Sequence, residues 1–148
     1  MAIGLASARE IKHTLGTALP ETAPEDVIMR MTGFSLERRQ PETFDVETKP
    51  VIHACEEVVS EIAMLCASVV TEAPEELSAD LNDSGLTLVG AGAELAGLDK
   101  RLGDTLGIPC RIADAPSKCA VRGLYKIMEE PELYAAAIMR KSRRGNMR

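Results

Sequence analysis

The stretch of sequence that decides the fold runs from residue 86 to residue 99 and reads Leu86-Thr87-Leu88-Val89-Gly90-Ala91-Gly92-Ala93-Glu94-Leu95-Ala96-Gly97-Leu98-Asp99. A short apolar run, typical of a buried strand, comes first, and a glycine-rich turn follows it directly. After the turn, leucines recur at helical spacing, at Leu95, Leu98, Leu102 and Leu106, and Gly107 is a natural helix stop. The pattern predicts a strand, a glycine turn and a helix.

The chain downstream of this stretch repeats the alternation. Residues 109–113 read as a second short strand, and Pro116 begins a helix that continues through Ala120, Leu124 and Met128. A further short helix is expected from Pro131. Two short strands joined through a helix are expected to lie parallel, so the second half is predicted to be an α/β unit.

The chain upstream contains one long predicted helix, at about 48–71. Thr48 can cap it, and Pro50 suits its first turn. Its apolar stripe at three- and four-residue steps comprises Val51, Cys55, Val58, Ile62, Leu65 and Val69. We expect this stripe to face the core, and we expect the glutamates off the stripe, Glu56, Glu57 and Glu61, to form a solvated face.

Shorter elements are expected before that helix and after it. Residues 5–16 predict a helix with Ile11 and Leu15 on one face, and residues 20–24 predict a turn. Runs at 27–31 and 43–46, separated by a polar connection, predict a strand hairpin. Residues 74–80 predict a short acidic helix or turn.

Composition limits the kinds of partner. Of the 148 residues, 45 % are hydrophobic and 3 % aromatic, with no Trp, so the core must be aliphatic and base-stacking platforms are not expected. The net charge is −6, and the last nine residues carry five basic side chains and no acid, which leaves −11 on the rest. An acidic body argues against nucleic acid as a partner. The basic residues of this tail (140–148) are Arg140, Lys141, Arg143, Arg144 and Arg148.

Other residue types give little sign of chemistry. Cys55, Cys66, Cys110 and Cys119 have no C-x-x-C spacing, so they are expected to be buried, reduced thiols. His13 and His53 are isolated and are assigned no catalytic role. The sequence shows neither an apolar run long enough for a membrane span nor a signal peptide, so we expect a cytoplasmic protein.

The glycine-rich turn after Val89 is the best candidate site. Backbone N–H groups at such a turn are exposed, and glycines let a ligand approach the backbone closely. The turn is not a P-loop, because no Gly-Lys-Ser/Thr follows, and it is not G-x-G-x-x-G, because Leu95 lies three residues after Gly92. From spacing alone, a nucleotide site and an ordinary turn between a strand and a helix both remain open.

The quoted stretch resembles a segment of the MreB-type bacterial actins. The resemblance continues through residues 105–109, 112–116 and 119–123, and upstream through 74–80 and 8–12. It implies the C-terminal lobe of an actin-like, ribonuclease H-like fold over residues 1–139, followed by the basic tail. Residues 1–20 and 71–130 would form the larger subdomain, and about 21–70 the inserted hairpin-and-helix subdomain.

The resemblance also implies a site. Gly90 and Gly92 match glycines of the adenosine motif, and Lys12 matches a helix lysine near the adenine and ribose. Two residues depart from the family pattern: Ala91 replaces the middle glycine, and Arg9 stands where a glutamate is usual. Both erode the nucleotide face, so ATP or ADP is expected to bind weakly or not at all.

The resemblance implies a limit as well. Family members cradle phosphates between two Asp-x-Gly hairpins, and this sequence contains no Asp-x-Gly-Thr. Phosphoryl transfer needs a phosphate clamp, a metal ion and a positioned water together, so the chain alone is not expected to be an enzyme, and Mg²⁺ is expected only with an N-terminal lobe.

Two functions therefore stand beside each other. The first is part of an ATP-dependent cytoskeletal filament governing cell shape, with other actin-like protomers, or a separately encoded N-terminal lobe, as partners. The second is a nucleotide-independent module that caps or decorates actin-like filaments. The basic tail either contacts an anionic membrane weakly or stays solvated.

Overall fold

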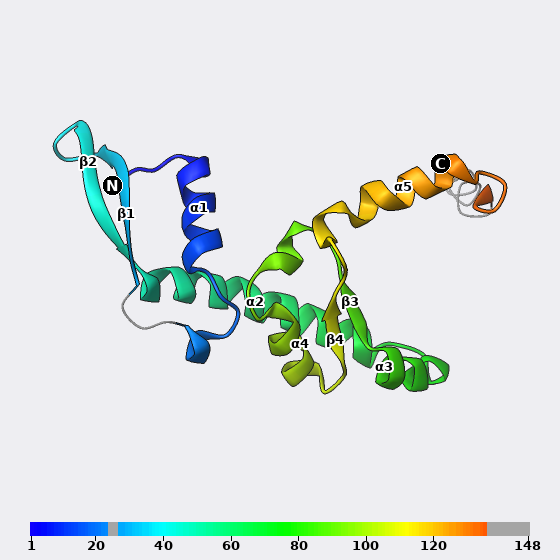
Figure 1. Cartoon of the computed structure of the whole chain (residues 1–148). Helices are drawn as coiled ribbons and strands as arrows, with labels where there is room; N and C mark the ends of the chain where they lie inside the picture. Colours follow the sequence, from blue (N-terminus) through cyan, green and yellow to red (C-terminus); the bar gives the residue numbers. More distant parts are fainter. Residues whose placement is uncertain (24–26, 136–148) are drawn as a thin grey trace, which may run out of the picture.

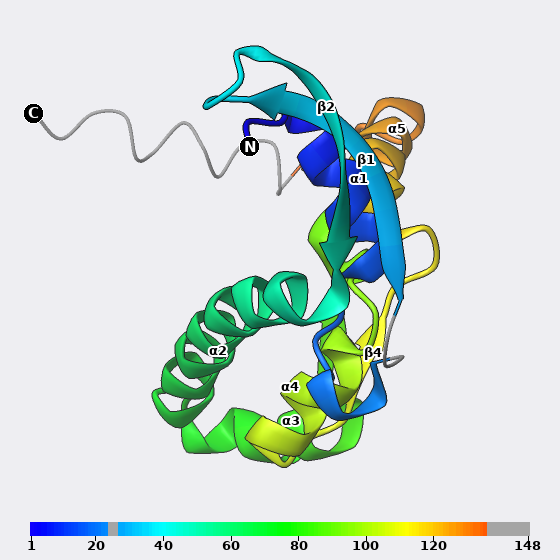
Figure 2. The same cartoon turned by 90° about the vertical axis from the view of Figure 1, so that its left-hand side faces the viewer.

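The computed structural model describes residues 1–23 and 27–135 (Figure 1). The helices are α1 (Leu5–Leu15), α2 (Thr48–Thr71), α3 (Ser78–Ser84), α4 (Leu98–Leu106) and α5 (Cys119–Glu129), and the strands are β1 (Ile28–Ser35), β2 (Gln40–Glu47), β3 (Leu86–Leu88) and β4 (Cys110–Ile112). Short 3₁₀ turns are η1 (Pro20–Thr22), η2 (Glu75–Leu77), η3 (Ala91–Glu94) and η4 (Pro116–Lys118). The hairpin and α1 lie at one end of α2, and α3 lies at the other (Figures 1 and 2).

The predicted hairpin is confirmed and is longer than the sequence indicated. Strands β1 and β2 pair antiparallel from Ile28 opposite Glu47 to Ser35 opposite Gln40. Gly33 and Pro41 interrupt the alternating pattern, yet both lie within the strands. Gly33 is needed because Ala2 pairs with Phe34, and a Cβ at residue 33 would lie 2.9 Å from the Ala2 carbonyl oxygen.

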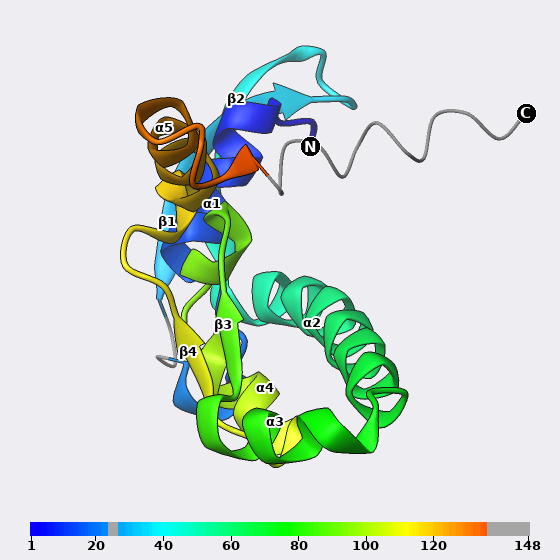
Figure 3. The same ribbon diagram turned by 90° about the vertical axis from the view of Figure 1, so that its right-hand side faces the viewer.

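The predicted α/β unit is also confirmed. Strands β3 and β4 pair parallel, with Leu86 opposite Cys110 and Leu88 opposite Ile112, and α4 connects them (Figure 3). The helix begins at Leu98 rather than at Leu95, because Gly97 adopts a left-handed conformation immediately before it. Leu98 and Leu102 are buried, as the stripe predicted.

Helix α2 has the predicted bounds, but its predicted buried face is wrong. The helix packs against α4 through Val59 and Ala63, which join Ala18 and two α4 leucines in the core. By contrast, Leu65 and Val69 are mostly exposed. The helix carries apolar residues on more than one face, and the smaller side chains on the Val59–Ala63 face let α4 approach.

Two smaller expectations need correction, and a third falls largely outside the described residues. Glu56 is not on a fully solvated face, because it pairs with Arg101 of α4. The four cysteines are free, as expected, but they are half-buried rather than buried. Residues 131–134 form turns and residue 135 is helical, so the short helix expected from Pro131 falls largely outside the described residues.

Two further points concern the ends and the surroundings of the chain. The basic tail and the end of the predicted lobe at residue 139 lie outside the described residues. Among the helices that the structure describes, none is long and apolar enough to cross a membrane.

Candidate functional site

The glycine turn leaves β3 with a conformation that requires glycine at its first position. Gly90 has a φ of 88°, in the region that residues with a Cβ rarely adopt. Its backbone N–H donates a hydrogen bond to the Pro116 carbonyl oxygen over 2.8 Å, which joins the turn to the start of η4. Gly90 is therefore a structural residue of the turn.

Gly92 has no such structural requirement. It lies within η3, without a positive φ, and a Cβ built on it would meet no atom within 4 Å in the described part of the chain. Neither backbone strain nor packing accounts for glycine here. The bare backbone instead faces the open space of two adjoining cavities, where a ligand could approach it closely.

Helix α1 is fixed against the segment that follows η3. The Thr17 hydroxyl donates to the Ala96 carbonyl oxygen over 3.2 Å, and the Ala18 N–H donates to the same oxygen over 2.8 Å. Both donors follow α1 directly, so the C-terminal half of this helix lies across from the glycine turn. Lys12 and Gly92, distant in sequence, thereby line the same cavities.

The smaller of these cavities brings together three of the five predicted site residues. It has a volume of about 70 Å³ and is lined by Lys12, His13, Gly16, Ala91, Gly92, Glu94, Leu95 and Ala96. Gly90 and Arg9 are not part of its lining, and Arg9 is exposed on α1. His13 and Glu94 were not predicted here; their adjacency to Lys12 and to the glycine turn is the signal that could have found them.

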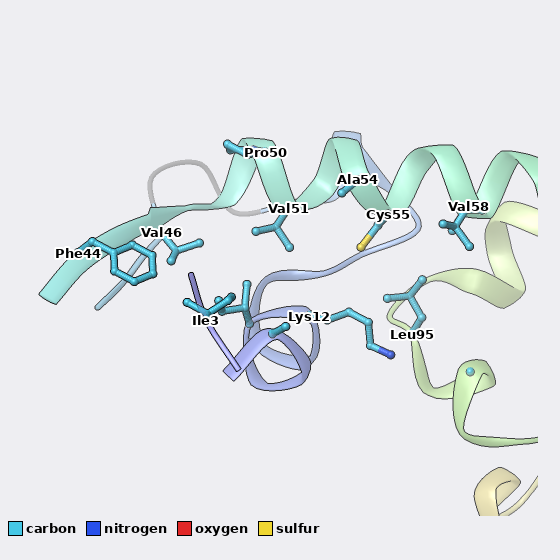
Figure 4. A pocket seen from close by; sticks show the side chains of 14 residues that line it. Ile3, Lys12, Phe44, Val46, Pro50, Val51, Ala54, Cys55, Val58 and Leu95 are labelled. Carbon is cyan, nitrogen blue, oxygen red and sulfur yellow. The ribbon is translucent and has the colours of Figure 1, made fainter. Parts of the chain in front are cut away.

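The larger cavity is apolar, and Figure 4 shows the side chains that line it. Its volume is about 590 Å³, within the range of small-molecule sites. Its walls come from residues 3–12, β2, the first half of α2 and the glycine turn, and they include Ile3, Phe44, Val46, Val51, Cys55 and Val58. Lys12, Gly92 and Leu95 line both cavities, and Figure 4 shows the Lys12 side chain extending toward Leu95.

The pKa of the Cys55 thiol depends on two features of the larger cavity, its burial and the charge of Lys12. Burial raises the pKa of the Cys55 thiol, while the positive charge of Lys12 acts on that pKa in the opposite direction. The site thus offers the cation Lys12, the carboxylate Glu94, bare backbone and apolar walls. Among residues 1–23 and 27–135, no three His, Cys, Asp or Glu side chains gather in a group that could hold a metal ion. This arrangement is suited to binding a ligand with an apolar ring and an anionic part.

The fold defines a class: part of an actin-like α/β fold. The chain is similar in structure to MreB5 of Spiroplasma citri bound to ADP, with a TM-score of 0.79 and 23 % identity over 93 % of this chain and 41 % of that one. A second structure of the same protein, bound to AMPPNP, also gives a TM-score of 0.79 at 21 % identity, over 94 % of this chain and 41 % of that one.

The chain belongs to the MreB/Mbl protein family, whose model matches residues 1–136. It is 31 % identical over 132 residues to the cell shape-determining protein MreB of Escherichia coli K12, covering 89 % of this chain and 38 % of that protein. It is 35 % identical over 121 residues to the cell shape-determining protein Mbl of Bacillus subtilis 168, covering 82 % of this chain and 36 % of that protein. The chain therefore spans about two fifths of the length of these relatives.

Proposed function

We propose that this chain serves as the C-terminal lobe of an MreB-type filament protein and provides the adenosine side of its nucleotide site. The observation that carries the proposal is Gly92, whose bare backbone faces open space across from Lys12. The names of the relatives support a role in cell shape. The nucleotides bound by the Spiroplasma protein support the choice of ligand.

The proposed binding mode assigns a part to each wall. The apolar cavity beside Cys55 takes the base, and Lys12 lies beside the adenine and ribose, where its positive charge also favours an anionic ligand. The bare backbone at Gly92 permits close approach, while the Cβ of Ala91 lines the smaller cavity and narrows it. Arg9 adds no acceptor for the ribose. Binding to this chain alone is therefore weak, in the range of about 1 mM.

The remaining functions of an ATPase are assigned to parts that the relatives have beyond the matched region. We propose that residues 1–20 and 71–130 form the larger, ribonuclease H-like subdomain and that about 21–70 form the inserted one. Hydrolysis then requires a phosphate clamp and Mg²⁺ from an N-terminal lobe. Partners would be that lobe and other actin-like protomers, in the cytoplasm.

A second function is favoured by the size of the smaller cavity. At about 70 Å³ it is well below the roughly 300 Å³ at the lower end of ligand pockets, and Ala91 contributes to its wall. If the smaller cavity is too small to admit a nucleotide, the chain is a module that caps or decorates actin-like filaments without nucleotide.

Co-expression separates these two functions. The chain is expressed with the part of Escherichia coli MreB that precedes the matched region, and the purified material is assayed for Mg²⁺-dependent ATP hydrolysis. A stoichiometric complex that hydrolyses ATP supports the lobe. Failure to form that complex, together with sedimentation of the chain with intact MreB filaments in the absence of nucleotide, would favour the decorating module instead.

A further inference from the structure

Two cysteine side chains from distant parts of the chain pack against the same core. Cys66 lies on α2, and Cys110 is the first residue of β4, beyond α3, β3 and α4. Both side chains contact the buried cluster around Val59, Ala63 and Leu102, and helix α4 packs against both α2 and β4. Both thiols are free and half-buried. The fold therefore holds two thiols at one small core and leaves each of them partly accessible to small solutes.

This pair differs from the other cysteines of the chain. Cys55 and Cys66 are three helical turns apart on α2, roughly 16 Å along the axis at 1.5 Å per residue, so these two thiols cannot meet. Cys119 begins α5, and its Sγ donates a weak hydrogen bond to the Ala115 carbonyl oxygen over 3.7 Å. Cys110, by contrast, is close enough to Cys66 for the charge of the Cys66 thiolate to raise its pKa. Neither Cys55 nor Cys119 is among the causes of that shift.

We propose that Cys66 and Cys110 are a redox modification site, where hydrogen peroxide converts the two thiols into a reversible disulfide. The bond would join α2 to β4 and enclose β3, the glycine turn and α4 in one covalent loop. A thiol reductant opens such a bond again by exchange. The site lies within this chain, and it is independent of the function proposed above.

The reaction transfers two electrons in two steps. The Cys66 thiolate attacks one oxygen of hydrogen peroxide, the O–O bond breaks, and the leaving hydroxide takes the proton that the thiol released and departs as water. Cys66 is then a sulfenic acid. The Cys110 sulfur attacks Sγ of Cys66, the S–S bond forms, the S–O bond breaks, and the oxygen leaves with the Cys110 proton as a second water. The two thiols lose two electrons and two protons, and the peroxide gains both.

Burial decides which thiol reacts first. Burial raises the pKa of the Cys110 thiol, and the charge of Cys66 raises that pKa further, so Cys110 holds little thiolate near neutral pH. Since the thiolate is the form that attacks peroxide, Cys110 is the slower thiol in the first step. Cys66 therefore takes the sulfenic acid, and Cys110 resolves it.

Peptide mapping of the full chain after treatment with hydrogen peroxide tests the proposal. Once free thiols are blocked, cleavage after Lys, Arg and Glu places each of the four cysteines in its own peptide, with Cys66 in 62–72 and Cys110 in 102–111. We expect these two peptides to be joined in most chains and to separate after treatment with dithiothreitol. A non-reducing gel checks that the bond lies within one chain.

Single serine variants identify the thiols. Cys66→Ser and Cys110→Ser should each abolish the joined peptide. The matched controls are Cys55→Ser and Cys119→Ser, because they also replace half-buried thiols and should leave its yield unchanged. Circular dichroism checks that all four variants fold.

Three results would overturn the proposal. In the first, peroxide leaves both thiols free or converts them to sulfinic acids without joining 62–72 to 102–111. In the second, the bond joins two separate chains. In the third, Cys66 and Cys110 pair with the other two cysteines as often as with each other.

Discussion

Arg101 Nη2 of α4 lies 2.5 Å from Glu56 Oε1 of α2, and this ion pair joins two helices that are 45 residues apart in sequence. Ser60 donates a hydrogen bond to the same Glu56 oxygen over 3.4 Å. Both charged side chains are about two-thirds buried, and within the described structure Glu56 Oε2 and Arg101 Nε are buried without a hydrogen-bond partner. The pair is therefore partly desolvated, and each charge depends on the other.

Removing either partner should destabilise the chain. Glu56→Ala or Arg101→Ala leaves the other charge partly buried and unpaired, at a cost of about 1–3 kcal/mol in the free energy of unfolding. The double variant should cost clearly less than the sum of the two, because no lone charge remains. Urea unfolding of the unchanged chain, the two single variants and the double variant measures these free energies. Two small and additive effects would show that the pair is as weak as an ordinary surface pair.

The packing of α2 on α4 gives a second prediction. Leu102→Ala empties a fully buried position and should cost about 2–5 kcal/mol. Leu65→Ala removes a largely exposed side chain and should change stability by less than about 0.5 kcal/mol. The comparison is direct because both changes remove the same atoms. Equal losses at the two positions would mean that the apolar stripe expected from the sequence is buried after all.

The two glycines of the turn should separate stability from binding. Gly90→Ala forces a side chain into a positive φ and should destabilise the chain by about 1–3 kcal/mol. Gly92→Ala adds a Cβ that meets no neighbour within 4 Å, so stability should stay within about 0.5 kcal/mol while nucleotide binding falls. Thermal unfolding of both variants checks the first half of the prediction. A large destabilisation by Gly92→Ala would show that residue 92 serves packing rather than a ligand.

The thiol of Cys55 should report the charge of Lys12. Burial raises its pKa, so at a given pH it holds less thiolate than a free thiol, and its alkylation rate should rise only at higher pH. Lys12→Ala removes the charge that lowers this pKa, so the pH profile should move further upward. Mass spectrometry after timed alkylation measures the rate at each cysteine.

Cys110 provides the control for this experiment. Burial also raises the pKa of the Cys110 thiol, but Lys12 is not among the causes of that shift. Its profile should therefore not respond to Lys12→Ala. Equal shifts at Cys55 and Cys110 would point to a general loosening of the fold, and no shift at Cys55 would place Lys12 away from that thiol.

The parts of the fold that follow from local pattern were predictable. The glycine turn, the leucine stripe of α4 and the bounds of α2 each have a signal within a few residues, and the structure agrees with them. The buried face of α2 has no such signal, because Val58 and Val59 are adjacent and equally apolar. Which of them is buried depends on α4, about 40 residues away, through the contacts of Val59 and Ala63.

The candidate site also contains residues that could be predicted from the sequence and residues that could not. Lys12, Ala91 and Gly92 could be named from the resemblance, and they do line one cavity. The contribution of the hairpin could not be foreseen. Phe44 and Val46 line the larger cavity because of the way β2 packs beside the start of α2, and no local sequence pattern indicates that packing. Arg9 was named from its position in the family pattern, yet it lies exposed on α1 and outside the lining of both cavities.

Titration of the isotope-labelled chain with ADP, followed by amide chemical shifts, tests the central claim most directly. We expect saturable shifts at residues 90–94 and around Lys12 with a dissociation constant of about 1 mM. Lys12→Ala and Gly92→Ala should each weaken this binding at least about fivefold, and Lys100→Ala, which removes an exposed lysine of α4 outside both cavities, should leave it unchanged. The absence of shifts up to about 10 mM ADP, or shifts that the three variants affect equally, would contradict an adenosine site on this lobe.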